Sequence, residues 1–121
     1  MTIKEERYGD VVVLAPKGKM MGGPETQALH DRVKQLIEEG VRKVVIDLKD
    51  VKWLNSSGLG VLMGAMTSLR NAGGDLKLAR VTEKVQSLFM ITKLITIFDT
   101  YDTVEEAVKS FQEEEKKEES K

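Results

Sequence analysis

The chain has 121 residues, of which 40% are apolar and 32% charged, a formal net charge of -1 and no cysteine. That length allows one domain with one core, and the lack of cysteine excludes disulfides, thiolate chemistry and cysteine zinc sites. A chain so close to neutral is a poor candidate for direct nucleic-acid binding. No apolar run approaches the roughly 18 residues of a membrane span, and the first ten residues carry no apolar leader, so we expect a cytoplasmic protein without a membrane span.

The first half of the chain predicts two strands, a helix and a third strand. The β-branched run DVVVLAPKG ends at a proline and a glycine, as strands closed by turns do, and residues 3–8 are expected to pair with it. From Pro24 to Gly40 the apolar positions follow helical spacing, with Leu29, Val33, Leu36 and Ile37 on one face. The continuous apolar run KVVIDL then predicts a buried parallel strand.

The second half alternates between helix and strand. The stretch WLNSSGLGVLMGAM should form a helix, with DLKLA as a strand, a helix over about 82–92, IFDTY as a strand and a helix over 104–111. Strands joined by helical crossovers predict an α/β fold: a single domain with a mostly parallel or mixed sheet of five strands, about four helices and the order ββαβαβαβα. The domain is expected to span residues 1–112, and residues 113–121 to form a charged C-terminal tail.

The stretch WLNSSGLGVLMGAM places an asparagine and two serines between the end of a strand and the start of a helix. A side-chain oxygen there would cap the helix by accepting from a free backbone N–H. Gly58, Gly60 and Gly64 predict close packing of this helix on the sheet. Glycine lowers the stability of a helix, so three glycines in one helix indicate positions where a side chain would not fit. Capping and packing alone account for the pattern. The same geometry would also tolerate a phosphate on serine, which makes the position a candidate switch.

The stretch IDLKDVKWLNSSGLGVL resembles the signature of the STAS domain, best known from bacterial anti-sigma-factor antagonists. The resemblance implies the STAS fold and a protein that is not an enzyme and needs no cofactor or metal. It implies partner switching, in which the antagonist captures an anti-sigma factor that is also a serine kinase. The kinase phosphorylates the first serine of the pair, here Ser56, and a serine phosphatase restores it.

Two departures from the family pattern accompany this resemblance. Asn55 stands where the family usually has aspartate, which removes a carboxylate beside the serine pair. Before the first helix, GKMMGGPETQAL carries two methionines where the family often has an acidic segment, and we expect one of the two to pack inward. The predicted partner-binding residues are therefore Met20, Met21, Asn55, Ser56, Ser57 and Gly58.

The same residues allow alternative functions. Ser56 with His30 could suggest a hydrolase, yet the chain lacks the glycine-x-serine-x-glycine elbow. A metal site could be imagined from Asp47, Asp50 and Asp99, although carboxylates at strand ends more often meet solvent. A non-switching STAS adaptor, serving a signalling scaffold or a lipid-transport complex, fits the same residues.

Two further features have open interpretations in the sequence. Trp53 is either a core anchor or a partner contact, because tryptophan is enriched in both settings, with the core favoured. The basic residues Lys77, Arg80 and Lys84 lie near a junction between strand and helix, and we expect them to form a solvated rim, with recognition of an acidic partner as the alternative.

Overall fold

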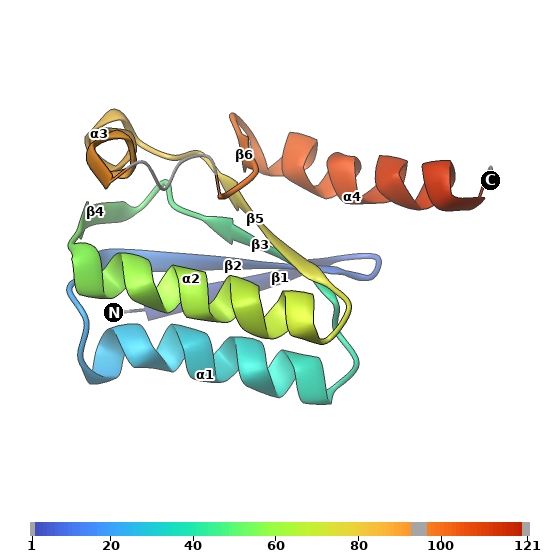
Figure 1. Ribbon diagram of the computed structural model, residues 1–121, viewed down its shortest axis with the longest axis horizontal. Helices are drawn as coiled ribbons and strands as arrows, with labels where there is room; N and C mark the ends of the chain where they lie inside the picture. The colour runs from blue at the N-terminus through green and yellow to red at the C-terminus, as the bar shows by residue number, and fades with distance from the viewer. Residues whose placement is uncertain (1, 93–96, 120–121) are drawn as a thin grey trace.

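The computed structural model describes residues 2–92 and 97–119, and within them the chain forms a mixed sheet with helices on both faces (Figure 1). The strands are β1 (Thr2–Tyr8), β2 (Val11–Met20), β3 (Lys43–Asp47), β4 (Val51–Leu54), β5 (Asp75–Ala79) and β6 (Thr100–Tyr101). The helices are α1 (Pro24–Glu38), α2 (Ser56–Asn71), α3 (Glu83–Thr92) and α4 (Val104–Glu119). The predicted α/β class is confirmed.

The sheet runs in the order β1-β2-β3-β5-β6. β1 pairs antiparallel with β2, and β2, β3, β5 and β6 are parallel, as expected for strands joined by helical crossovers. β4 is the strand that the sequence did not predict: it pairs with the end of β2, from Gly18 opposite Val51 to Met20 opposite Leu54. A bulge between these pairs leaves Lys52 of β4 without a partner on β2.

Two cores lie on opposite faces of the sheet. α1 and α2 cover one face, and their buried positions at helical spacing include Leu29, Val33 and Leu36 from α1, as predicted. α4 covers part of the other face, over a smaller cluster made of Val11, Val13, Val45, Ala79, Val104, Ala107, Val108 and Phe111. The face under α1 and α2 is called the inner face below, and the face under α4 the outer face. Among the described residues, no helix is long and apolar enough to cross a membrane.

The three glycines of α2 do not share one role. A Cβ on Gly58 would lie 2.0 Å from the Met20 carbonyl oxygen, so this glycine is needed where the helix meets the end of β2. Gly64 faces α1, because a Cβ there would lie 3.0 Å from His30 Cε1. Gly60 is exposed, and a Cβ there would have nothing within 4 Å, so the prediction that it packs on the sheet is wrong. The glycine pattern indicated close packing without saying which face each residue occupies.

α4 continues across the predicted boundary between domain and tail. It runs to Glu119, and Glu114 contacts the sheet through Lys77. The side chain of Lys77 is fully buried, so its predicted place in a solvated rim is wrong. Its ammonium donates to Ser110 Oγ at 2.8 Å and to Glu114 Oε1 at 2.7 Å, and it lies 4.3 Å from the centre of the Phe111 ring. A buried lysine is tolerated when it is paired in this way.

Removing the partner of this lysine should cost more than removing the lysine itself. We expect Glu114→Gln to lower the free energy of unfolding by about 1 kcal/mol, because the buried Lys77 ammonium then has no counter-charge. The loss is modest because the Glu114 carboxylate is itself largely exposed to solvent. In a Lys77→Met background the same change should have no effect, since no charge remains to be compensated. Urea unfolding of the four proteins of this double-mutant cycle measures the difference. Equal losses in both backgrounds would contradict the pairing.

Candidate functional site at the N-terminus of α2

Asn55 links the start of α2 to the end of β2. Its backbone is extended, with φ -100° and ψ -179°, and its Oδ1 accepts from the Gly58 N–H at 2.8 Å, which is a helix N-cap. Its Nδ2 donates to the Met21 carbonyl at 2.9 Å, and its backbone N–H donates to the Met20 carbonyl at 3.2 Å. Aspartate would keep the cap but has no donor for the Met21 carbonyl, so asparagine suits this loop.

The connection from β2 to α1 packs against the first turn of α2. Gly22 has φ +85°, a conformation that favours glycine, and a Cβ there would lie 2.8 Å from Ser57 Cβ. Thr26, which is buried, fixes the loop from within α1: its hydroxyl accepts from the Gly22 N–H at 3.1 Å and donates to the Gly22 carbonyl at 3.2 Å. Thr26 was not among the residues predicted from the sequence, although a threonine in the first turn after Gly-Gly-Pro is a signal for such a back-bond.

Ser56 and Ser57 are the first two residues of α2, and both are exposed. Within the described residues, neither hydroxyl has a hydrogen-bond partner. The first turn of α2 contains no acidic residue, and the partial positive charge of a helix N-terminus favours an anion there. An enzyme could therefore reach either hydroxyl, and a phosphate on Ser56 would meet no like charge from its own helix turn.

The structure brings the predicted site residues together. Met20 is fully buried and Met21 is 46% exposed, so the expectation that one of the two packs inward is confirmed. Gly58 is buried against Met20, while Asn55 is half-buried beneath the exposed serines. The exposed surface of the site is thus made of Met21, Ser56 and Ser57, and the other predicted residues hold it in place. Their role in partner binding stays a prediction.

The hydrolase alternative lacks its geometry. His30 Nε2 lies 3.2 Å from Ser68 Oγ, at the contact between α1 and α2, and Ser68 is twelve residues from Ser56, about 18 Å along the helix.

Asp47, one of the three carboxylates considered for a metal, is bonded to Arg80. Among the described residues, no group of three or more His, Cys, Asp or Glu side chains is placed to hold a metal ion.

His30 should make stability depend on pH. Burial, with a smaller contribution from Lys34, lowers the pKa of His30 below its usual value. The folded state then disfavours the charged imidazole, so this contribution to stability is present above the unfolded pKa of about 6.5 and is lost as the pH falls through the lower folded pKa. We expect His30→Gln to lose less stability than the parent protein between about pH 7 and about pH 5. Urea unfolding at both pH values tests this, and parallel losses would contradict it.

Comparisons with known proteins agree with this architecture. The model of the STAS domain family matches residues 2–107. A Thermotoga maritima protein named as an anti-sigma factor antagonist is 31% identical over 101 residues, covering 82% of this chain and 88% of the relative. The anti-sigma-B factor antagonist of Bacillus subtilis is 39% identical over 71 residues, covering 59% of this chain and 64% of that protein.

Solved structures show the same fold. A crystal structure of an anti-sigma factor antagonist from Thermotoga maritima superposes with a TM-score of 0.81 at 28% identity, covering 89% of this chain and 92% of the other. The unphosphorylated anti-sigma factor antagonist SpoIIAA superposes with a TM-score of 0.72 at 19% identity, covering 92% of this chain and 98% of that one, which supports the fold alone. With its sheet order, its Asn-Ser-Ser-Gly turn into α2 and the family match over nearly all its length, this chain belongs to the STAS domain family.

Proposed function

We propose that this protein is an anti-sigma factor antagonist, which binds an anti-sigma factor through the start of α2 and the neighbouring loop and is controlled by phosphorylation of Ser56. The names of its relatives support the general role. The observation that carries the site is the exposed Ser56 hydroxyl, which has no partner within the described residues and lies at the first position of a helix. In this proposal the protein binds partners and catalyses no reaction.

The surface suits a switch between a neutral and a charged state. A hydroxyl at the first position of α2 can be buried by a partner at small cost, whereas a phosphate adds about -1.5 to -2 charges at the same point. The protein itself can carry that charge, because the helix N-terminus stabilises anions. A partner surface selected for the hydroxyl would have to desolvate the charge, so the complex would separate. In this scheme the anti-sigma factor is also the serine kinase, and a phosphatase reverses the modification.

A non-switching STAS adaptor is the second candidate. It would use the same Met21 and Ser56 surface, but without modification, and Asn55 favours it by holding the loop with an amide where the family pattern usually has a carboxylate. The two candidates differ in whether phosphate is found on Ser56 in the cell.

Mass spectrometry of the protein purified from its native cells tests the proposal. We expect a phosphopeptide that contains Ser56 and fragments that assign the phosphate to Ser56 and not to Ser57. Ser56→Ala should abolish the modification, while Ser57→Ala, as the matched control, should leave it. No capture of an anti-sigma factor from the same genome by the unmodified protein, together with no phosphate at Ser56 under any growth condition, would favour the adaptor.

A further inference from the structure

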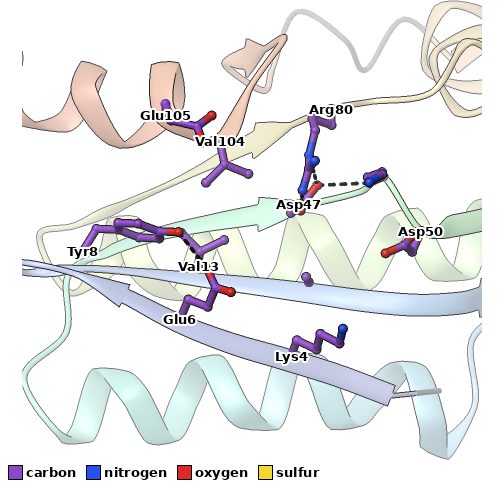
Figure 2. A pocket seen from close by; sticks show the side chains of 11 residues that line it. Lys4, Glu6, Tyr8, Val13, Asp47, Asp50, Arg80, Val104 and Glu105 are labelled. Atoms are coloured by element: carbon purple, nitrogen blue, oxygen red, sulfur yellow. Dashed lines mark hydrogen bonds and ion pairs between the residues drawn. The ribbon is translucent and has the colours of Figure 1, made fainter.

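The outer face of the sheet is only partly covered by α4. The helix packs over β3, β5 and the first residues of β2, and the side chains of β1 and the rest of β2 on this face are left uncovered by helix. A cavity of about 290 Å³ lies there, between the first two strands and the start of α4 (Figure 2). Its apolar floor is Val13, Ala15 and Val104, and charged side chains form its walls. This opening is separate from the Ser56 site.

Exposed lysines from several segments gather on this face. Lys4 and Lys49 line the cavity, and Ala15, which lies opposite Lys4, is followed two residues later by Lys17 on the same side of the strand. Beyond the bulge, Lys19 is in register with Trp53 of β4. The ammonium of Lys84, from α3, lies over the Trp53 ring, 4.9 Å from the ring centre. All of these lysines are exposed, and together they define the lysine face: Lys4, Lys17, Lys19, Lys49 and Lys84.

The charges of the lysine face are only partly balanced within the protein. Elsewhere Lys43 pairs with Asp10 and Lys77 with Glu114. In the part of the chain that the structure describes, no lysine of the lysine face forms an ion pair. Of the carboxylates of the cavity, Asp47 is paired with Arg80 through Nε at 3.0 Å and also through Nη2. Glu6 accepts from the neutral Tyr8 hydroxyl at 2.6 Å and keeps its charge. Asp50 and Glu105 remain beside the lysines.

We propose that the lysine face is a second interaction surface, which binds an acidic segment of a partner protein. The five lysines outnumber the three carboxylates beside them that have no cationic partner, Glu6, Asp50 and Glu105, so the open sheet face carries an excess of positive charge that attracts a chain of glutamates and aspartates. The cavity itself holds four carboxylates against Lys4, Lys49 and Arg80, so the acidic chain would lie over the strands beside it, toward Lys17 and Lys19. Asp50 and Glu105 would repel a continuous phosphate backbone, whereas a peptide can place neutral or basic residues opposite them. The inference does not depend on modification of Ser56.

Two other occupants fit this surface less well. The acidic end of α4 points away from β4 and α3, to the opposite end of the molecule, so the chain's own tail does not cover the lysine face (Figure 1). A membrane surface would use apolar side chains inserted beside the lysines. Among residues 2–87 and 97–114, whose side chains the structure describes, the exposed large apolar side chains are Tyr8, which is engaged with Glu6, and Met21, which belongs to the Ser56 site.

Fluorescence anisotropy with a labelled peptide of ten glutamates, at about 50 mM salt, tests the surface. The paired variant Lys17→Glu with Lys19→Glu should weaken binding at least tenfold. The matched pair Lys34→Glu with Lys109→Glu removes exposed lysines from α1 and α4 and changes the net charge equally, and it should weaken binding less than twofold. Circular dichroism checks folding, and Lys4→Glu with Lys49→Glu is a second variant of the lysine face should the first be unfolded.

Several outcomes would overturn the proposal. Equal weakening by the two charge-matched pairs would show that only net charge attracts the peptide, and no measurable binding by the parent protein would remove the surface altogether. Sedimentation with vesicles of phosphatidylserine and phosphatidylcholine is the remaining control. Vesicle binding that is lost in the Lys17→Glu, Lys19→Glu protein, together with no peptide binding, would assign the lysine face to a membrane instead.

Discussion

Gly58→Ala is expected to lower the free energy of unfolding by about 3 kcal/mol, whereas Gly60→Ala, two residues further along the same helix, should leave it unchanged or raise it. The new Cβ at position 58 would lie 2.0 Å from the Met20 carbonyl oxygen and 2.8 Å from its carbon. These are backbone atoms, and the carbonyl already accepts from the Asn55 N–H, so the strand cannot retreat without losing that bond.

Gly60 is the matched control, because a Cβ at this position would meet nothing within 4 Å and its helical backbone suits alanine. Alanine there should contribute about 0.5–1 kcal/mol through helix propensity. Urea unfolding measures both variants, and the melting temperature of Gly58→Ala should fall by about 10 °C. Similar stability of the two variants would contradict the claim that the close contact between α2 and β2 requires glycine at position 58.

The fold was predictable where periodicity is strong. The α1 face of Leu29, Val33 and Leu36 and the buried run of β3 are local patterns, and both were predicted. β4 was missed because four residues with one strand partner carry little local signal, and that partner is the end of β2, more than thirty residues earlier in the chain. Lys77 was misplaced for a related reason: its burial depends on Phe111 and Glu114, which only the docking of α4 brings near.

The candidate site was predictable as a set of residues but not as a set of contacts. The Asn-Ser-Ser-Gly motif indicates a helix start from sequence alone, and the cap by Asn55 follows from local rules. The bonds from Asn55 to Met20 and Met21, and the approach of Gly22 to Ser57, join segments that are distant in the chain. No local rule reports such contacts, which is why the approach of Gly22 to Ser57 was not predicted. The bond between Thr26 and Gly22 is local, and its signal in the sequence was missed.

Ser56→Glu is expected to weaken binding of the anti-sigma factor at least a hundredfold, which corresponds to about 2.7 kcal/mol, whereas Ser56→Ala should cost about 1 kcal/mol or less. Folding should be unaffected, because the side chain is exposed and a carboxylate in the first turn of α2 is favourable. The loss comes from the partner, which must bury a charge where it otherwise meets a hydroxyl.

Thr67→Glu is the matched control for this result, since it adds the same charge to an exposed position of α2 eleven residues away, about 16 Å along the helix. It should change affinity less than threefold, because a charge outside the contact is screened over about 8–10 Å at physiological salt. Titration calorimetry with the purified anti-sigma factor compares the three variants with the parent protein. The comparison of Ser56→Glu with Ser56→Ala discriminates between the candidates, because both variants lose the hydroxyl and only the glutamate adds a charge. If Ser56→Glu binds as tightly as Ser56→Ala, Ser56 lies outside any charge-sensitive contact, and the non-switching adaptor becomes the better account of this surface.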